Sequence, residues 1–136
     1  METFVITKPS DAIPARERVR EMARTLGFGL VDQTNLAFTI TEFALKLIAT
    51  AEYCRLHIEY YRDEEGKTGI EVRLYERHAE PGYVDSEWAA QLVDDLDVNC
   101  DRSDETLITL RKWRTSTSLS NDSSLLCPVT ETGEEP

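Results

Sequence analysis

Two groups of polar residues in this chain have side chains of types that could do chemistry. Glu42 and Lys46 lie four positions apart within a stretch of helical periodicity, which places them on the same side of a helix. They could form an ion pair there, or Lys46 could contact a phosphate group directly. Glu76, His78 and Glu80 follow a stretch of strand periodicity, where a histidine between carboxylates could exchange protons near neutral pH or could simply lie on the surface. What either group does depends on the elements that position it.

Hydrophobic periodicity predicts two helices, the second of which would carry Glu42 and Lys46. Apolar residues in the segment 11–26 recur at three- and four-residue steps, and Ser10 or Asp11 is expected to cap this helix. Gly27 should end it, because glycine readily takes the left-handed conformation that follows many helices. The segment 32–51 has its apolar residues on one face and predicts a second, longer helix.

Strand periodicity dominates the remainder of the folded part. The alternation from residue 54 onward predicts an antiparallel hairpin with one buried face, on which Tyr60 points inward and Glu71 outward. A short helix is expected over residues 86–94. Strands are expected at residues 4–6, 54–61, 70–75, 96–100 and 106–113. This order predicts an α/β (α+β) two-layer sandwich with a mixed, largely antiparallel sheet and helices on one face.

Composition and charge limit the possible partners. The 136 residues suit one compact domain, and 26 acidic against 15 basic residues give a net charge of −11 at pH 7. So acidic a chain repels phosphate backbones, which argues against a nucleic-acid partner. Apolar runs are too short to cross a bilayer, and the first residues lack the pattern of a secretory signal. We therefore expect a cytoplasmic protein with no membrane partner.

The cysteines and the C-terminal segment complete this outline. Three widely spaced cysteines and two histidines match no metal-ligand spacing, so no metal site is expected. Residues 1–114 are expected to form the domain. Residues 115–136 are rich in Ser, Thr and acidic side chains and should form a flexible tail, because they cannot bury enough apolar surface to offset the entropy of ordering.

A family resemblance is carried by residues 9–34, Thr41-Glu42-Phe43-Ala44, Gly69-Ile70-Glu71-Val72, residues 92–96, Glu105-Thr106 and Lys112-Trp113. These segments resemble the RsbT-type anti-sigma serine kinases of the GHKL (Bergerat) ATP-binding superfamily. Together they span residues 4–113, which is all but the tail. The resemblance implies the fold with an ATP lid, here shortened.

The resemblance also implies which positions would form a nucleotide site. In that family a helical glutamate polarises the attacking hydroxyl group, and an asparagine four residues later holds the magnesium ion. Glu42 matches the glutamate, but Lys46 replaces the asparagine, and an ammonium group cannot coordinate a cation. Glu76, His78 and Glu80 replace the adenine-binding Asp-x-Gly-x-Gly motif and bring side chains where the backbone needs glycine.

Two further departures concern the lid and the end of the site. The lid is reduced to residues 80–87, which carry three carboxylates and no basic side chain, the wrong charge for phosphates. The closing Gly-Thr pair reads Glu105-Thr106, so Thr106 alone is kept. These changes imply a catalytically impaired serine-kinase-like regulatory protein, a pseudokinase, which needs no cofactor and acts by protein–protein binding in a partner-switching system.

The expected partner, by resemblance, is a STAS-domain antagonist or the regulatory domain of a PP2C-type phosphatase. The alternative is an active protein-serine kinase that uses ATP and Mg²⁺ in an unorthodox site with Glu42, Lys46 and Glu76. A homodimeric domain that only uses the scaffold is a third possibility. The residues considered for partner contact are Arg16, Arg20, Arg24, Tyr83 and Trp88. The arginines could instead be a solvated helix side, and the two aromatic side chains could cap the sheet where a nucleotide would lie.

Overall fold

The computed structural model describes residues 2–77, 85–99 and 105–114. Within them a five-stranded antiparallel sheet has the strand order β1-β2-β3-β5-β4. The strands and helices are β1 (Glu2–Ile6), α1 (Ala12–Thr25), α2 (Leu30–Ile48), β2 (Cys54–Arg62), β3 (Thr68–Arg77), β4 (Asp95–Asn99) and β5 (Glu105–Trp113), with 3₁₀ turns η1 (Pro9–Asp11) and η2 (Ala89–Gln91). The description does not include residues 78–84, 100–104 and 115–136, and the last of these ranges is the predicted tail.

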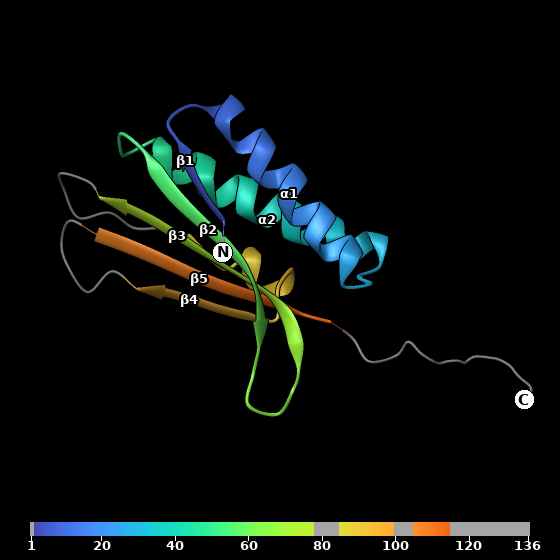
Figure 1. Cartoon of the computed structure of the whole chain (residues 1–136). Helices are drawn as coiled ribbons and strands as arrows, with labels where there is room; N and C mark the ends of the chain where they lie inside the picture. The colour runs from blue at the N-terminus through green and yellow to red at the C-terminus, as the bar shows by residue number, and fades with distance from the viewer. Residues whose placement is uncertain (1, 78–84, 100–104, 115–136) are drawn as a thin grey trace, which may run out of the picture.

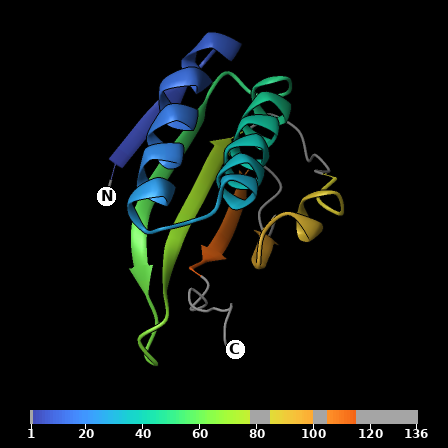
Figure 2. The same cartoon turned by 90° about the vertical axis from the view of Figure 1, so that its right-hand side faces the viewer.

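Both helices cover one face of the sheet, which confirms the predicted two-layer sandwich (Figures 1 and 2). The core lies between the layers and consists of the apolar faces of α1 and α2 and the inward residues of the central strands. The expectation of a mixed sheet is wrong for the described strands, because all four pairings are antiparallel. None of the helices in the described ranges is long and apolar enough to cross a membrane.

The ends of the helices follow the sequence in part. Gly27 has a φ of 87°, and the next amide, that of Phe28, donates to the carbonyl of Ala23, so glycine ends α1 as predicted. Asp11 is the residue before α1, but no side chain caps the helix. The Asp11 carboxylate instead accepts hydrogen bonds from the backbone amide and the hydroxyl of Thr7. This bond to the preceding loop replaces the cap, and the prediction of Ser10 or Asp11 as a capping residue is wrong.

The predicted helix over residues 86–94 is only the single 3₁₀ turn η2. Tertiary bonds fix the chain directly after it. The backbone amide of Asp94 donates to the carbonyl of Arg111, and the Asp94 carboxylate accepts the backbone amide of Trp113 at 2.7 Å. These bonds direct the chain into β4 before a longer helix can form, so non-local pairing outweighs the local helical pattern.

Two side chains of the predicted hairpin differ from their expected environments. Tyr60, near the end of β2, is 46% exposed. The hairpin of β2 and β3 projects beyond the helices (Figure 1). Glu71 points away from the helices and yet is only 1% exposed. Its carboxylate accepts a hydrogen bond of 2.8 Å from Arg111 Nε and lies 2.8 Å from Arg73 Nη2. The Arg111 guanidinium also lies 4.3 Å from the centre of the Tyr61 ring, so side chains of neighbouring strands cover Glu71.

Gly69 is required where β3 and β5 pair. It lies opposite Trp113 in the register, and a Cβ atom at this position would overlap with the main-chain carbonyl of Lys112. Glycine inside a strand often marks such a close approach of two backbones. The pairing of β3 with β5 therefore depends on the absence of a side chain here.

Candidate functional site

The flank of α2 that bears Lys46 is covered by an aromatic side chain from the segment after β3. The Trp88 ring lies 4.9 Å from the Phe43 ring and 6.0 Å from the Phe38 ring, centre to centre. Its indole nitrogen donates a 2.8 Å hydrogen bond to the carbonyl of Asp85. Trp88 is thus held on α2 by two ring contacts, and the hydrogen bond to Asp85 orients the indole within its own segment.

Lys46 is exposed and lies over this tryptophan. Its ammonium nitrogen is 5.9 Å from the centre of the Trp88 ring, within the range of a cation–π interaction. No ion pair joins Glu42 and Lys46 in the described part of the chain, so the interpretation of the two residues as such a pair is wrong. The reason is geometric, because the Lys46 side chain lies over the indole on one flank of α2, whereas Glu42 lines a groove between α1 and α2.

Glu76 and Thr106 lie side by side at one end of the sheet. They are opposite each other in the register of β3 and β5, both buried, and they point towards the helical layer. A depression of about 590 Å³ opens at this end, and both residues line it together with Arg55 and Arg77. The structure therefore brings together two of the nucleotide-site positions considered from the sequence.

Cys54 is the third residue in this row, opposite Glu76 in the pairing of β2 with β3. Burial, together with the charge of Glu76, raises the pKa of its thiol from 9.0 to about 12. Because the thiolate is the reactive form, Cys54 is expected to resist iodoacetamide at pH 9 until the protein unfolds. Mass spectrometry of the intact and the urea-unfolded protein checks this, and rapid modification of folded Cys54 would contradict it.

The raised pKa of Cys54 also has a consequence for stability. Above pH 9 the unfolded thiol ionises, whereas the folded thiol stays neutral until about pH 12, so its contribution to stability is complete below pH 9 and is lost as the pH rises. The free energy of unfolding should therefore fall more steeply between pH 9 and 11 in the wild type than in Cys54→Ala. Parallel slopes would contradict the assignment.

A groove of about 600 Å³ runs between α1 and α2 on the side away from the sheet. Its lining residues are Arg16, Glu17, Arg20, Thr34, Ala37, Phe38, Thr41 and Glu42. Arg16 and Arg20, considered from the sequence for partner contact, therefore lie on one cavity with Glu42. Arg24 is exposed near the end of the same helix and does not line the groove.

The site residues considered from the sequence lie in different parts of the structure. Glu42 lines the helical groove, and Glu76 and Thr106 line the depression at the end of the sheet. His78, Glu80 and Tyr83 lie outside the described residues. Phe38 was not singled out from the sequence, although its position off the apolar face of α2 is a signal for an exposed aromatic side chain. It is 50% exposed in the groove.

Neither a metal site nor a match to known proteins adds to this picture. Within residues 2–77, 85–99 and 105–114, no three His, Cys, Asp or Glu side chains are placed to hold a metal ion. No protein-family model matches the chain, and no curated protein matches it.

Proposed function

We propose that the protein is a serine-kinase-like regulatory protein that works by binding other proteins and does not transfer phosphate. The observation that carries this proposal is that Glu42 and Glu76 line two different cavities. A kinase site needs the base, the metal ligand and the adenine contact around one cavity. Here Glu42 lines the groove between the helices, whereas Glu76 lines the depression at the end of the sheet.

The packing of Trp88 supports the same proposal. The side of α2 on which Lys46 stands is the side on which the resemblance to the GHKL kinases would place magnesium and the phosphates. The Trp88 ring lies there against Phe43, with the Lys46 ammonium over it. An aromatic ring offers no ligand for a metal ion, and an ammonium group offers no lone pair. The arrangement therefore supports a flank of α2 that is covered by Trp88 and does not hold a nucleotide.

The helical groove is the surface proposed for the partner. It combines a half-exposed aromatic ring, Phe38, with two guanidinium groups, those of Arg16 and Arg20. Exposed aromatic and arginine side chains are the types most enriched at the centres of protein interfaces. By the resemblance, the proposed partner is a STAS-domain antagonist or the regulatory domain of a PP2C-type phosphatase.

Equilibrium titration with a fluorescent ATP analogue and Mg²⁺ tests the loss of nucleotide chemistry. We expect a dissociation constant weaker than about 1 mM, which corresponds to less than about 4 kcal/mol of binding free energy. Glu64→Ala, in the exposed turn between β2 and β3, serves as a control variant. Micromolar affinity that is lost in Glu42→Ala or Glu76→Ala, but not in Glu64→Ala, would overturn the proposal in favour of an active kinase.

Calorimetric titration with purified STAS-domain and phosphatase regulatory domains from the same genome tests the binding role. We expect one of them to bind with micromolar affinity and to lose at least about tenfold, or 1.4 kcal/mol, with Arg16→Glu. Arg62→Glu, an exposed arginine at the end of β2, is the matched control and should bind normally. Absence of binding to both classes, or equal loss in both variants, would contradict the proposed surface.

A further inference from the structure

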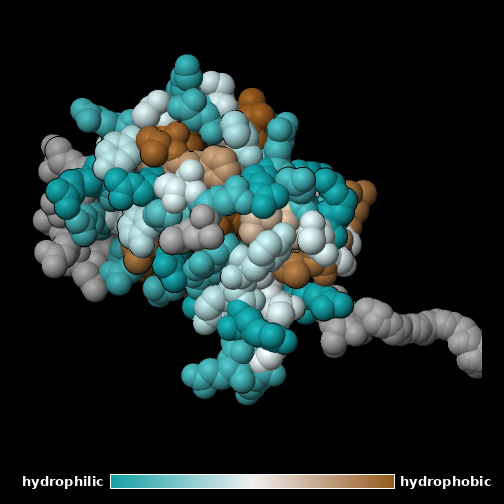
Figure 3. Space-filling model, viewed as in Figure 1, coloured by the Kyte–Doolittle hydropathy of each residue, from teal (hydrophilic) through white to brown (hydrophobic). Residues whose placement is uncertain are grey.

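The groove between α1 and α2 has an apolar floor that the described residues leave uncovered. Phe38 is 50% exposed there and is flanked by Ala37 and by the methyl-bearing side chains of Thr34 and Thr41. Figure 3 shows apolar residues exposed among hydrophilic ones over the helical layer. Exposed aromatic side chains in a groove of this size are typical of sites that receive an apolar segment.

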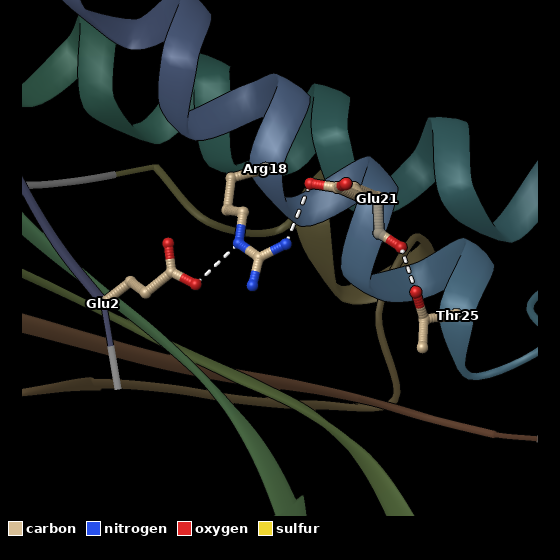
Figure 4. A network of polar contacts seen from close by, with 4 residues as sticks. All are labelled: Glu2, Arg18, Glu21 and Thr25. Carbon is tan, nitrogen blue, oxygen red and sulfur yellow. Dashed lines mark hydrogen bonds and ion pairs between the residues drawn. The ribbon is translucent and has the colours of Figure 1, made fainter.

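The charges around this groove are distributed unevenly. Arg18 of α1 is already engaged, since its guanidinium lies 2.6 Å from the Glu2 carboxylate and 2.8 Å from that of Glu21 (Figure 4). Arg16 and Arg20 line the groove and form no ion pair within the described residues. The carboxylates of Glu17 and Glu42 also line it. An occupant would therefore meet Arg16, Glu17 and Arg20 on the α1 side and Glu42 on the α2 side.

The C-terminal segment of the same chain has the complementary chemistry. Residues 115–136 contain no lysine or arginine, and they contain one apolar run, Leu125-Leu126-Cys127-Pro128-Val129. Acidic side chains stand on both sides of this run, at Asp122, Glu131, Glu134 and Glu135. An apolar run with carboxylates beside it matches an aromatic floor with arginines at its rim.

The segment begins close enough to reach the groove. The amide of Arg114 donates to the carbonyl of Thr68, and the Lys112 ammonium lies 3.5 Å from the carboxylate of Asp32 in the first turn of α2. Phe38 is six residues further along α2, which is about 9 Å. The ten residues 115–124 precede the apolar run, and a random coil of ten residues has an r.m.s. span of about 18 Å. Ten residues reach at most about 33–36 Å when extended, so the linker is long enough to pass around α2 to the groove.

We propose that residues 125–129 occupy the groove between α1 and α2 and cover Phe38, with Glu131 beside Arg16 and Arg20. A linker that matches its span gives an effective concentration on the order of millimolar, so even a weak contact is largely formed. The segment would then be an internal competitor for any protein that binds the groove. The competition depends on the proposed function, but the docking itself does not.

Paramagnetic relaxation in the full chain tests the docking. A nitroxide is attached at Thr132→Cys, just beyond the apolar run, in a chain that also carries Cys100→Ser and Cys127→Ala and in which the remaining Cys54 is buried with a raised pKa and does not react. The ¹⁵N-labelled, spin-labelled chain is diluted with unlabelled chain, so that signal loss reports contacts within one molecule. We expect the amide signals of Thr34, Phe38 and Thr41 to lose most of their intensity, while those of the turn at 63–66 keep theirs.

Matched variants separate docking from incidental contact. Leu126→Asp and Arg20→Glu should restore the groove signals, whereas Leu119→Asp in the linker and Arg24→Glu outside the groove should not. Unchanged groove signals would overturn the proposal, as would stronger losses on the open face of the sheet. Losses that occur only when labelled and spin-labelled molecules are mixed would assign the groove to a second copy of the chain and would also overturn it. The absence of nucleotide or partner binding has no bearing on these results.

Discussion

Phe43→Ala is expected to lower the free energy of unfolding by about 3–5 kcal/mol, the cost typical of truncating a fully buried phenylalanine. Phe43 is fully buried in the C-terminal half of α2, and its ring supports Trp88 at 4.9 Å. The variant therefore removes core volume and also the base on which the tryptophan lies. Urea unfolding followed by circular dichroism measures the first effect, and a red shift of the Trp88 emission in the folded protein reports the second.

Phe38→Ala is the matched control for this prediction. Phe38 also contacts Trp88, at 6.0 Å between ring centres, but half of its surface is already exposed, so its loss should cost only about 1 kcal/mol. Trp113 can be replaced by phenylalanine in both proteins to leave the Trp88 signal alone. Equal destabilisation by the two alanine variants would contradict the assignment of Phe43 as the main support of Trp88.

Arg111→Met is expected to lower the free energy of unfolding by about 2 kcal/mol. The Glu71 carboxylate is 1% exposed and is shared between Arg111 and Arg73, so the variant leaves a buried charge with one partner instead of two. Removing one partner of a fully buried pair costs about 3–5 kcal/mol, and the partial exposure of the Arg111 side chain reduces this figure. Methionine keeps the packing against Tyr61, which isolates the charge.

A double-mutant cycle and a surface control complete this experiment. Glu71→Gln combined with Arg111→Met should cost less than the sum of the single changes, because the buried charge is then absent. Arg77→Met removes a more exposed arginine that pairs with Glu105 at 2.6 Å, and should cost less than about 1 kcal/mol. A cost for Arg111→Met as small as that for Arg77→Met would show that Glu71 does not depend on its guanidinium partners.

The parts of the fold that could be predicted depend on local patterns. Both helices, the turn at Gly27 and the alternation of β2 follow from periodicity and from the conformational freedom of glycine. The burial of Glu71 could not be predicted. Strand alternation shows which face a side chain is on, but long arginine side chains of the same strand and of a neighbouring strand decide whether the carboxylate meets water.

The candidate site was less predictable, for a related reason. The neighbourhood of Glu76 and Thr106 depends on the pairing of β3 with β5, which are separated by almost thirty residues in sequence, and no local pattern fixes that register. The position of Trp88 against α2 is also a non-local contact, and the sequence predicted a helix around it. Lys46 was interpreted from the sequence as the partner of Glu42 in an ion pair, but its neighbour in space is the Trp88 indole and not the Glu42 carboxylate.

The outer strand β4 has a consequence for how the protein behaves when crowded. It has only five residues, and two of them, Asp95 and Asp97, carry carboxylate side chains. Strands with unpaired edges tend to recruit further strands from other molecules, and charge on a short edge opposes this. Two copies that met along β4 would bring like charges together, so this boundary of the sheet discourages fibril-like growth.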